Sequence, residues 1–447
     1  MRECGTIAAH PNQPEPLLMT INPVSYYRAS ATDYPAFAAL SGRHEADTVI
    51  IGGGFAGLNT AIGLAERGHA GVVLLEAGQL GHGASGRNGG FAFGGYSLGE
   101  AALRRSQGAE RAKRMYDGTL WGVDSIRRRA AKYDIPCDPV EGGVIWANWF
   151  RDPEMLRGRQ RELAEHYGVD WRWMPQAELR ERIHSERYSE ALFESSALHL
   201  HPLNYAIGLG QAAAAQGVAI HERSPVVELR RDGSGWNIRT AEGEVKARRV
   251  VHACGGYIGG YAPRLDRSIL PISTYVMVTE PLGPRMAEIM DTSAAVYDTR
   301  FAFDYYRPLK DGRLLWGGRI TVRDPSPEQA KDILMTDLLR VFPQLRGVGI
   351  DYAWSGLMGY SKAQMPQIGE LEPGLWMVHA FGGHGVAPTA WGGELIASAI
   401  AEGDTRWKDF AGYQPDSAFK PFGFAAAQLN YWWLQTRDAW KDWREGR

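Results

Sequence analysis

The sequence has few cysteines, no long hydrophobic run and almost no net charge, and each shortage excludes a class of protein. Its 447 residues include only three scattered cysteines and no CxxC pair, which argues against a disulfide framework and a zinc site. No stretch of eighteen apolar residues occurs, so we expect no transmembrane segment. A formal net charge of -2 gives no global field that would recruit nucleic acid. We therefore expect a cytoplasmic protein with a small-molecule partner and no metal ion.

The first 45 residues form an N-terminal extension before the first regular element. Residues 1–24 contain four prolines and no apolar run long enough for a signal peptide, so we expect no export.

The run Thr-Val-Ile-Ile-Gly-Gly-Gly-Phe-Ala-Gly at residues 48–57 predicts a strand, a tight turn and a helix that together bind a dinucleotide. Gly52 would make the turn, Gly54 would let the backbone approach a pyrophosphate, and Gly57 would let the helix pack closely on the strand. Glu76 ends a second strand at 72–75, where its carboxylate would bind ribose hydroxyls and repel a 2'-phosphate. FAD and NAD remain as candidates. The other expected contacts here are Phe55, Ala56 and Ala77.

A glycine-rich loop directly after this unit, residues 81–90, favours FAD over NAD. Its backbone N–H groups, with Ser85 and Asn88 as donors and Arg87 as a charge partner, would follow a pyrophosphate toward an isoalloxazine ring. A flexible surface loop is the alternative. The cofactor residues expected in the loop are Gly83, Ala84, Ser85, Arg87, Asn88, Gly89 and Gly90.

The loop sequence Gly-Ala-Ser-Gly-Arg-Asn-Gly-Gly at 83–90 resembles the signature of the D-amino acid oxidase superfamily of FAD-dependent amine oxidoreductases, and most of all its gamma-glutamylputrescine oxidase-like branch. The resemblance covers roughly residues 25 to 430. Four shorter motifs extend it, at residues 25–27, 201–203, 250–256 and 380–385.

The resemblance implies an α/β fold with two interleaved domains. A discontinuous, Rossmann-like FAD-binding domain of the glutathione reductase type would take residues 46–138, 196–260 and 354–415. A β-sheet substrate domain would take residues 139–195 and 261–353. In this family, backbone at the position of Val226 contacts adenine, and the turn containing Gly255 closes under the cofactor.

A second glycine turn, at residues 382–385, ends a strand and opens a helix. Its backbone N–H groups and the positive end of the helix dipole would stabilise negative charge at flavin N1 and O2. The residues expected there are Gly382, Gly383, Gly385 and Val386. His384 lies in the same turn and is a candidate catalytic residue; a purely structural histidine is the alternative.

Residues 304–307 predict a strand of the substrate domain on which side chains alternate between two faces. Asp304 and Tyr306 would point one way, and Tyr305 and Arg307 the other. Related enzymes use tyrosine and arginine above the flavin, so Tyr306 or Arg307 is a candidate substrate clamp. The alternative is a core tyrosine and a surface salt bridge.

Two departures from sarcosine oxidase-like relatives bear on the chemistry. No cysteine follows Cys254, so we expect noncovalent FAD, and Ala387 replaces a lysine that binds carboxylates in that branch. A gamma-glutamyl amine, a polyamine or an N-substituted amino acid would be oxidised at its C–N bond by hydride transfer to flavin N5, and the imine would hydrolyse. Oxygen or another acceptor would reoxidise the flavin.

Several alternatives stay open. They are a D-amino acid or sarcosine-type dehydrogenase, an NAD-linked dehydrogenase, and a flavin-binding protein without catalysis.

The last segment, 416–447, predicts an amphipathic helix rich in tryptophan. We expect its aromatic face to pack against the protein's own domains. A homodimer contact or a docking site for an electron acceptor is the alternative. The residues expected on that face are Leu429, Trp432, Trp433, Thr436, Trp440 and Trp443.

Overall fold

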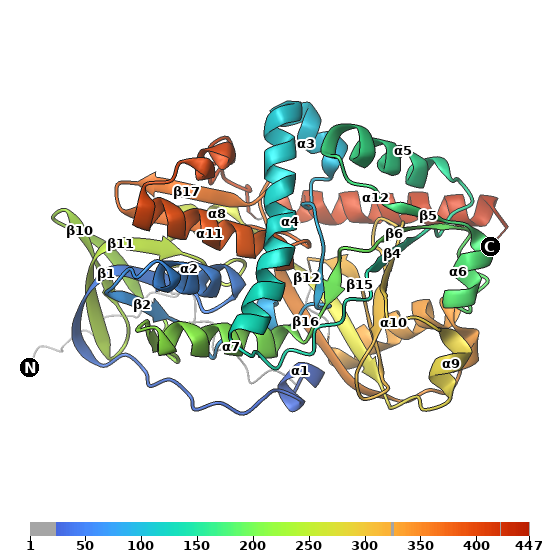
Figure 1. Ribbon diagram of the computed structural model, residues 1–447, viewed down its shortest axis with the longest axis horizontal. Helices are drawn as coiled ribbons and strands as arrows, with labels where there is room; N and C mark the ends of the chain where they lie inside the picture. Colours follow the sequence, from blue (N-terminus) through green and yellow to red (C-terminus); the bar gives the residue numbers. More distant parts are fainter. Residues whose placement is uncertain (1–23, 323–325, 421, 447) are drawn as a thin grey trace, which may run out of the picture.

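A computed structural model describes residues 24–322, 326–420 and 422–446. Two eight-stranded sheets lie side by side along the long axis of the molecule (Figure 1). The predicted fold class, a Rossmann-like α/β unit beside a β-sheet unit, is confirmed. In the part of the chain that the structure describes, no helix is long and apolar enough to cross a membrane.

The first sheet is mainly parallel, in the order β17-β18-β11-β1-β2-β8, with the hairpin β9–β10 added to β11. Strand β1 is buried on both faces: Ile50 packs toward the helices, and Val49 and Ile51 pack toward the hairpin. This explains why it reads as a continuous apolar run. The strands are β1 Gly42–Ile51, β2 Val72–Leu75, β8 Ala219–His221, β9 Glu228–Asp232, β10 Gly235–Arg239, β11 Gly243–His252, β17 Gln367–Glu372 and β18 Leu375–His379.

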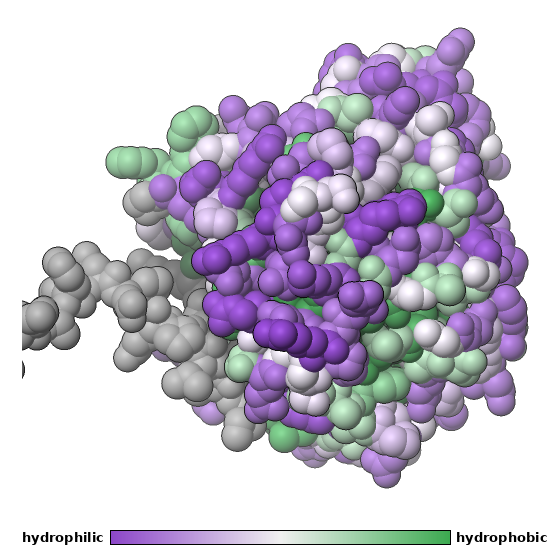
Figure 2. Space-filling model, turned by 90° about the vertical axis from the view of Figure 1, so that its left-hand side faces the viewer, coloured by the Kyte–Doolittle hydropathy of each residue, from purple (hydrophilic) through white to green (hydrophobic). Residues whose placement is uncertain are grey.

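Two helices with glycine at their N-caps cross each other on this sheet, α2 (Phe55–Glu66) and α11 (Val386–Glu402). They pack closely because small residues meet: a Cβ on Gly63 would lie 2.8 Å from the Cβ of Ala397. The other helices of this half are α3 Glu100–Gln107, α4 Ala109–Lys132, α7 Pro202–Ala215 and α8 Pro263–Ser268. The end of the molecule formed by the first sheet is mostly hydrophilic (Figure 2).

The second sheet is mainly antiparallel, in the order β16-β12-β15-β14-β13-β4-β6-β5. Helix α10 (Pro327–Val341) packs on it and begins with the capping box formed by Ser326 and Gln329. The strands are β4 Val144–Ala147, β5 Arg172–Met174, β6 Ala191–Glu194, β12 Leu270–Thr279, β13 Ala295–Asp298, β14 Tyr305–Pro308, β15 Leu314–Thr321 and β16 Ile350–Tyr360. The remaining labelled elements are α1 Tyr26–Ala29, α5 Glu154–Glu162, α6 Gln176–Arg182, α9 Arg285–Ile289, β3 Phe91–Ala92 and β7 Leu198–His199.

The strands of the two sheets alternate along the chain in the order expected for interleaved domains. The expected division at residue 354 falls inside β16, which stays in the second sheet until Tyr360. Residues 100–132 form two helices, α3 and α4, separated by Gly108.

The C-terminal helix α12 (Phe422–Arg444) exists, but its expected packing is wrong. Its buried residues are Asp438 and Asp442, whereas Trp433 and Trp443 are 63% and 75% exposed. The helix therefore docks on the protein through its polar side. It runs along the back of the molecule, behind α4 (Figure 1).

Candidate functional site

The turn between β1 and α2 has no room for side chains. Gly52 has a φ of +114°, and a Cβ there would lie 2.7 Å from the carbonyl oxygen of Ala253. A Cβ on Gly57 would overlap the carbonyl oxygen of Gly52. Gly54, the N-cap of α2, offers no side chain to cap the helix. The N-cap residue thus contributes no side chain, and the N–H groups that follow Phe55 in the first turn lie in a glycine cradle, which suits a phosphate.

Glu76 lies where a ribose-binding carboxylate is needed. Its two oxygens accept hydrogen bonds from the N–H groups of Gly53 (2.7 Å) and Gly78 (2.8 Å), so the carboxylate is fixed beside the glycine turn. Burial raises its pKa above the ordinary value, although those N–H groups oppose the shift. Ala77 follows it and is exposed.

The loop at 83–90 is held in place, so the alternative of a flexible surface loop is wrong. A Cβ on Gly83 would lie 3.0 Å from the ring of Tyr257, and one on Gly89 would lie 2.7 Å from the ring of Tyr305. Ser85 Oγ accepts a hydrogen bond from the N–H of Phe55 (2.8 Å) at the start of α2, and its hydroxyl keeps a proton to donate.

Two polar side chains of this loop serve its own fold. Arg87 donates to the carbonyl oxygens of His82 and Ser355, both at 3.0 Å, and so ties the loop to β16. Asn88 donates to the carbonyls of Ala84 and Ser85 and accepts from the N–H of Gly90. The expectation that Arg87 and Asn88 point at a pyrophosphate is therefore corrected: their side chains shape the loop whose backbone faces outward.

The second glycine turn leads into α11 without a side-chain cap. Gly382 has a φ of +62°, and a Cβ on Gly383 would lie 2.7 Å from the hydroxyl of Tyr360. Gly385 is the N-cap of α11, so the first-turn N–H groups at Val386 and beyond are available to an acceptor.

His384 lies in this turn against Phe93. Its Nε2 is 3.2 Å from the carbonyl oxygen of Phe93, and the two rings are 4.2 Å apart. A carbonyl oxygen only accepts, so Nε2 carries the proton and Nδ1 is the free acceptor. Burial lowers the pKa of His384 to about 4, so the ring is neutral at pH 7.

Strand β16 joins the two glycine segments. Arg87 bonds to it at Ser355, and Tyr360 lies over Gly382, so the two segments are about five residues apart on one strand, roughly 16 Å. Gly255 turns the chain after β11 with a φ of +57°, and Val226 packs beside the first sheet. A ribose acid, two uncapped helix N-termini and glycine cradles at this separation fit FAD.

The alternation expected on β14 is present. Tyr305 touches Gly89, and Arg307 donates through Nε to the carbonyl oxygen of Gly89 (2.7 Å). Tyr306 points the other way, where its ring stacks on Trp316 at 4.6 Å in the core of the second sheet. A substrate clamp at Tyr306 does not fit this position.

Arg307 is also not open to a substrate. Its guanidinium bonds to the carbonyl oxygen of Leu200 (2.8 Å), the hydroxyl of Tyr27 (3.2 Å) and His199 Nδ1 (3.1 Å), and the residue is 4% exposed. With its bond to Gly89, it fastens the glycine loop to the second sheet. We therefore correct its expected role from a carboxylate clamp to a positioning residue.

Sequence reasoning missed a continuous set of rings between the sheets, which we call the aromatic wall. Ring centroids are 5.6 Å apart for Phe91 and Tyr305, 6.3 Å for Tyr305 and Phe303, 5.7 Å for Phe303 and Tyr297, and 5.4 Å for Tyr297 and Phe93. The alternation Phe91-Ala92-Phe93 after the glycine loop was the available signal. Phe303, between Tyr305 and Tyr297, is 40% exposed and is the member of the wall that solvent reaches most.

Charged groups lie behind this wall. Arg159 pairs with Glu100 (2.8 Å), donates to the hydroxyl of Tyr297 (3.2 Å), and lies over the ring of Trp146 (4.6 Å). Burial raises the pKa of the nearby Glu194 to about 7. No group of histidine, cysteine, aspartate and glutamate suited to a metal occurs among the described residues.

Comparison with known proteins agrees with this site. The family model described as FAD dependent oxidoreductase matches residues 47–399. The chain is 36% identical to gamma-glutamylputrescine oxidoreductase of Escherichia coli, over 88% of this chain and 92% of that protein. It is 34% identical to the probable oxidoreductase OrdL of Haemophilus influenzae, over the same shares.

Solved structures share the fold. Glycine oxidase from Geobacillus kaustophilus superposes with a TM-score of 0.67 at 22% identity, covering 81% of this chain and 96% of that one. L-proline dehydrogenase from P. horikoshii superposes with a TM-score of 0.69 at 19% identity, covering 83% and 97%. The cofactor is FAD, as the glycine-rich loop at residues 81–90 predicts. The chain belongs to the family of FAD-dependent oxidoreductases that includes the D-amino acid oxidases.

Proposed function

We propose that this enzyme oxidises the C–N bond of an amine whose chain carries a positive charge, a gamma-glutamyl amine or a polyamine. The observation that supports this most is the aromatic wall, whose rings run from Tyr305, against Gly89 of the glycine loop, to Phe93, against His384 of the second glycine turn. The similarity to gamma-glutamylputrescine oxidoreductase supports the same substrate class.

Aromatic faces attract a cation by about 0.5–2 kcal/mol per ring, so the wall would hold an ammonium or methylene chain better than a carboxylate. Beside it, His384 is neutral at pH 7 and does not repel the substrate's charge. A small amino acid substrate would need a cation for the carboxylate beside its reacting carbon, whereas a gamma-glutamyl amine carries its carboxylate at the far end of the chain. Ala387 and the fully engaged Arg307 offer none at the positions expected.

The reacting nitrogen must be neutral before oxidation. Transfer of the amine from water into an aromatic pocket lowers its pKa, so its proton would leave to solvent, and the neutral imidazole of His384 would not oppose binding of the neutral amine. When bound, FAD supplies the acceptor for a hydride from the carbon beside that nitrogen. The resulting imine hydrolyses in water to an aldehyde or ketone and an amine.

The residues that would hold FAD are Gly52, Gly54, Phe55, Ala56, Gly57, Glu76, Ala77, Gly83, Ala84, Ser85, Gly89, Gly90, Val226, Gly255, Gly382, Gly383, Gly385 and Val386. The FAD would be noncovalent: Cys137 is fully buried, and Cys254 Sγ lies 3.3 Å from the carbonyl oxygen of Ile51. Acid precipitation should release all the flavin into the supernatant. Flavin that stays with the protein would show a covalent link.

We also propose that oxygen or another acceptor reoxidises the flavin, that the protein is cytoplasmic and that it forms a homodimer. The interleaved domains would divide as expected from the sequence, with the last boundary moved to residue 360 to keep β16 whole.

Anaerobic titration of the flavin absorption band tests the substrate class. Gamma-glutamyl amines, polyamines, N-methyl amino acids and D-amino acids would be added in turn. Bleaching by gamma-glutamyl amines or polyamines at the lowest concentrations supports the proposal. Bleaching only by D-amino acids or sarcosine would replace the proposed substrate class with that of a D-amino acid or sarcosine-type dehydrogenase. A flavin band that no amine bleaches would favour a flavin-binding protein without catalysis.

A further inference from the structure

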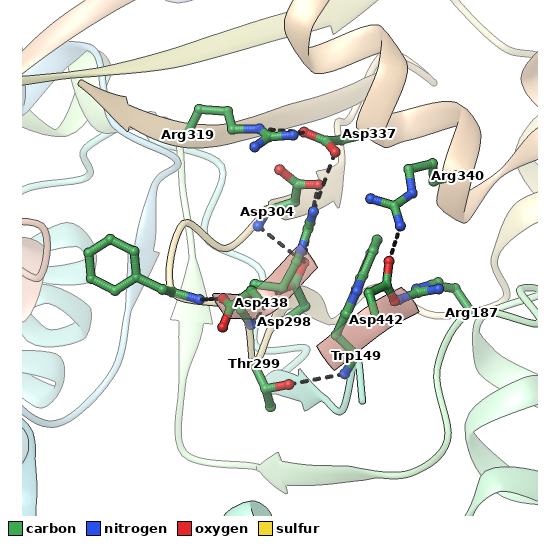
Figure 3. Close-up of polar contacts among 12 residues, drawn as sticks. Trp149, Arg187, Asp298, Thr299, Asp304, Arg319, Asp337, Arg340, Asp438 and Asp442 are labelled. Atoms are coloured by element: carbon green, nitrogen blue, oxygen red, sulfur yellow. Dashed lines mark hydrogen bonds and ion pairs between the residues drawn. The ribbon is translucent and has the colours of Figure 1, made fainter. Parts of the chain in front are cut away.

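Helix α12 is fastened to the second sheet through its acidic side chains. Asp442 forms ion pairs with Arg187 and Arg340, and Asp438 accepts a hydrogen bond from the N–H of Phe301 (2.8 Å) (Figure 3). Both aspartates are buried. The acidic charge of the helix is therefore turned toward the protein and neutralised there.

The surface under α12 fixes its rotation about its own axis. The guanidinium groups of Arg187 and Arg300 lie over the ring of Trp149 at 3.7 Å and 3.6 Å. Arg300 in turn pairs with Asp298 (2.7 Å), Asp304 and Asp337 (3.3 Å) (Figure 3). Rolling the helix would separate Asp442 from two cations, so the opposite side of α12 must face outward.

That outward side carries six large apolar residues, which we call the aromatic face of α12. Half of the large hydrophobic residues exposed in the described part of the chain belong to this face, so the exposed apolar side chains are clustered on one helix rather than scattered over the surface. Their exposed fractions are 79% for Phe422, 62% for Leu429, 51% for Trp432, 63% for Trp433, 55% for Trp440 and 75% for Trp443.

The charges beside the aromatic face are cationic. Arg437 and Arg444 are exposed, and their guanidinium groups lie 5.9 Å and 4.9 Å from the ring centres of Trp433 and Trp440. Arg437 also pairs with Asp438 (2.9 Å), so Arg444 is the main source of positive charge beside this face. No acidic side chain of residues 422–444, all of which the structure describes, is exposed. The outward surface is thus apolar, tryptophan-rich and positively charged.

We propose that α12 binds the surface of a membrane with anionic headgroups, lying flat with its aromatic face toward the lipid. Tryptophan favours the boundary between headgroups and acyl chains, and arginines beside it can reach lipid phosphates. The helix is about 34 Å long and lies along the protein surface, which suits a helix in the interface plane. This proposal is independent of the proposed substrate, and the chain's net charge of -2 does not oppose it because the charge here is local.

A second copy of the chain fits this face less well. Trp432 and Trp433 are consecutive and project about 100° apart, which makes a broad strip rather than the narrow seam of a helix pair. In a two-fold contact, each face would bring only arginines to the other. An anionic lipid surface is both broad and opposite in charge.

Flotation of the FAD-loaded enzyme with vesicles tests the proposal. Vesicles of phosphatidylcholine alone are compared with vesicles that also contain phosphatidylglycerol. The test variant is Trp433→Gln/Trp440→Gln/Trp443→Gln, and the control is Ile333→Gln, a 40% exposed residue on α10. The enzyme and the control should float with anionic vesicles and bind them roughly 5-fold more tightly than neutral ones, the factor for one arginine, Arg444, near an anionic surface. The test variant should not float.

Flavin reduction by amine, measured without vesicles, should be equal in all three proteins and shows that each is folded. Brominated lipids should quench tryptophan fluorescence in the enzyme and not in the test variant. Equal binding by enzyme and test variant would overturn the proposal. So would failure to float combined with a dimer in sedimentation that the test variant disrupts, because the face would then be a contact between copies.

Discussion

Replacement of Arg307 by methionine separates a positioning role from a substrate clamp. The change keeps an unbranched stem but removes every donor, so the carbonyl oxygens of Gly89 and Leu200 lose their partner. A buried polar group without a partner costs about 1–3 kcal/mol, so the two together predict a loss of about 2–6 kcal/mol. At about 2 °C per kcal/mol for a chain of this size, the melting temperature should fall by roughly 4–12 °C.

The glycine loop should also bind FAD less well, because Arg307 fastens it to the second sheet. Thermal unfolding with and without added FAD, and flavin content after gel filtration, measure both effects. Arg307→Lys should recover part of the stability, and Arg43→Met, at a side chain that is 89% exposed, serves as the control. An Arg307→Met protein with unchanged melting temperature and flavin content, but a much higher KM, would refute the reasoning and restore the clamp.

Three further changes test other parts of the account. Gly57→Ala places a Cβ on the carbonyl oxygen of Gly52 and should abolish FAD retention, seen as colourless protein; yellow protein at full flavin content would contradict the cradle. Phe303→Ala should raise KM for a cationic amine roughly 2- to 30-fold with little change in kcat, the effect of about 0.5–2 kcal/mol. The control Phe419→Ala, at an exposed ring elsewhere, should leave KM unchanged. Equal KM values for the Phe303→Ala variant and the parent enzyme would remove Phe303 from the site. Burial raises the pKa of Asp304 above its ordinary value, although Arg300 opposes the shift, so the folded protein holds this proton more tightly than the unfolded chain and stability should fall as pH rises above the ordinary pKa. Asp304→Asn should flatten this slope in melting curves taken at different pH, and a slope equal to that of the parent would contradict the assignment.

Local patterns explain what the sequence could predict. The β1–α2 turn and the acid after β2 lie within about thirty residues of each other, and their chemistry depends on neighbours along the chain. The interleaving of the two sheets follows from the resemblance of several such segments to one family.

The phase of an alternating strand could not be predicted. The pattern at 304–307 gave two faces, and only the sheet order shows that Tyr305 meets the glycine loop and that Tyr306 meets Trp316. The aromatic wall was missed for a related reason, because Phe93 and Tyr297 lie about two hundred residues apart in sequence.

The predicted orientation of α12 was wrong for a physical reason. Amphipathic patterns normally bury the apolar side, since burial of tryptophan is favourable. Here the buried Arg187 and the exposed Arg340, distant from α12 in sequence, select the side with Asp442, and they leave the aromatic face exposed.

The most direct test of the central claim is the rate of flavin bleaching when anaerobic enzyme is mixed with a gamma-glutamyl amine, compared with sarcosine at the same concentration. The account predicts rapid and complete bleaching by the gamma-glutamyl amine and slow or no bleaching by sarcosine, because the aromatic wall holds a cationic chain and Arg307 is not free to bind a small carboxylate. Faster bleaching by sarcosine would contradict it.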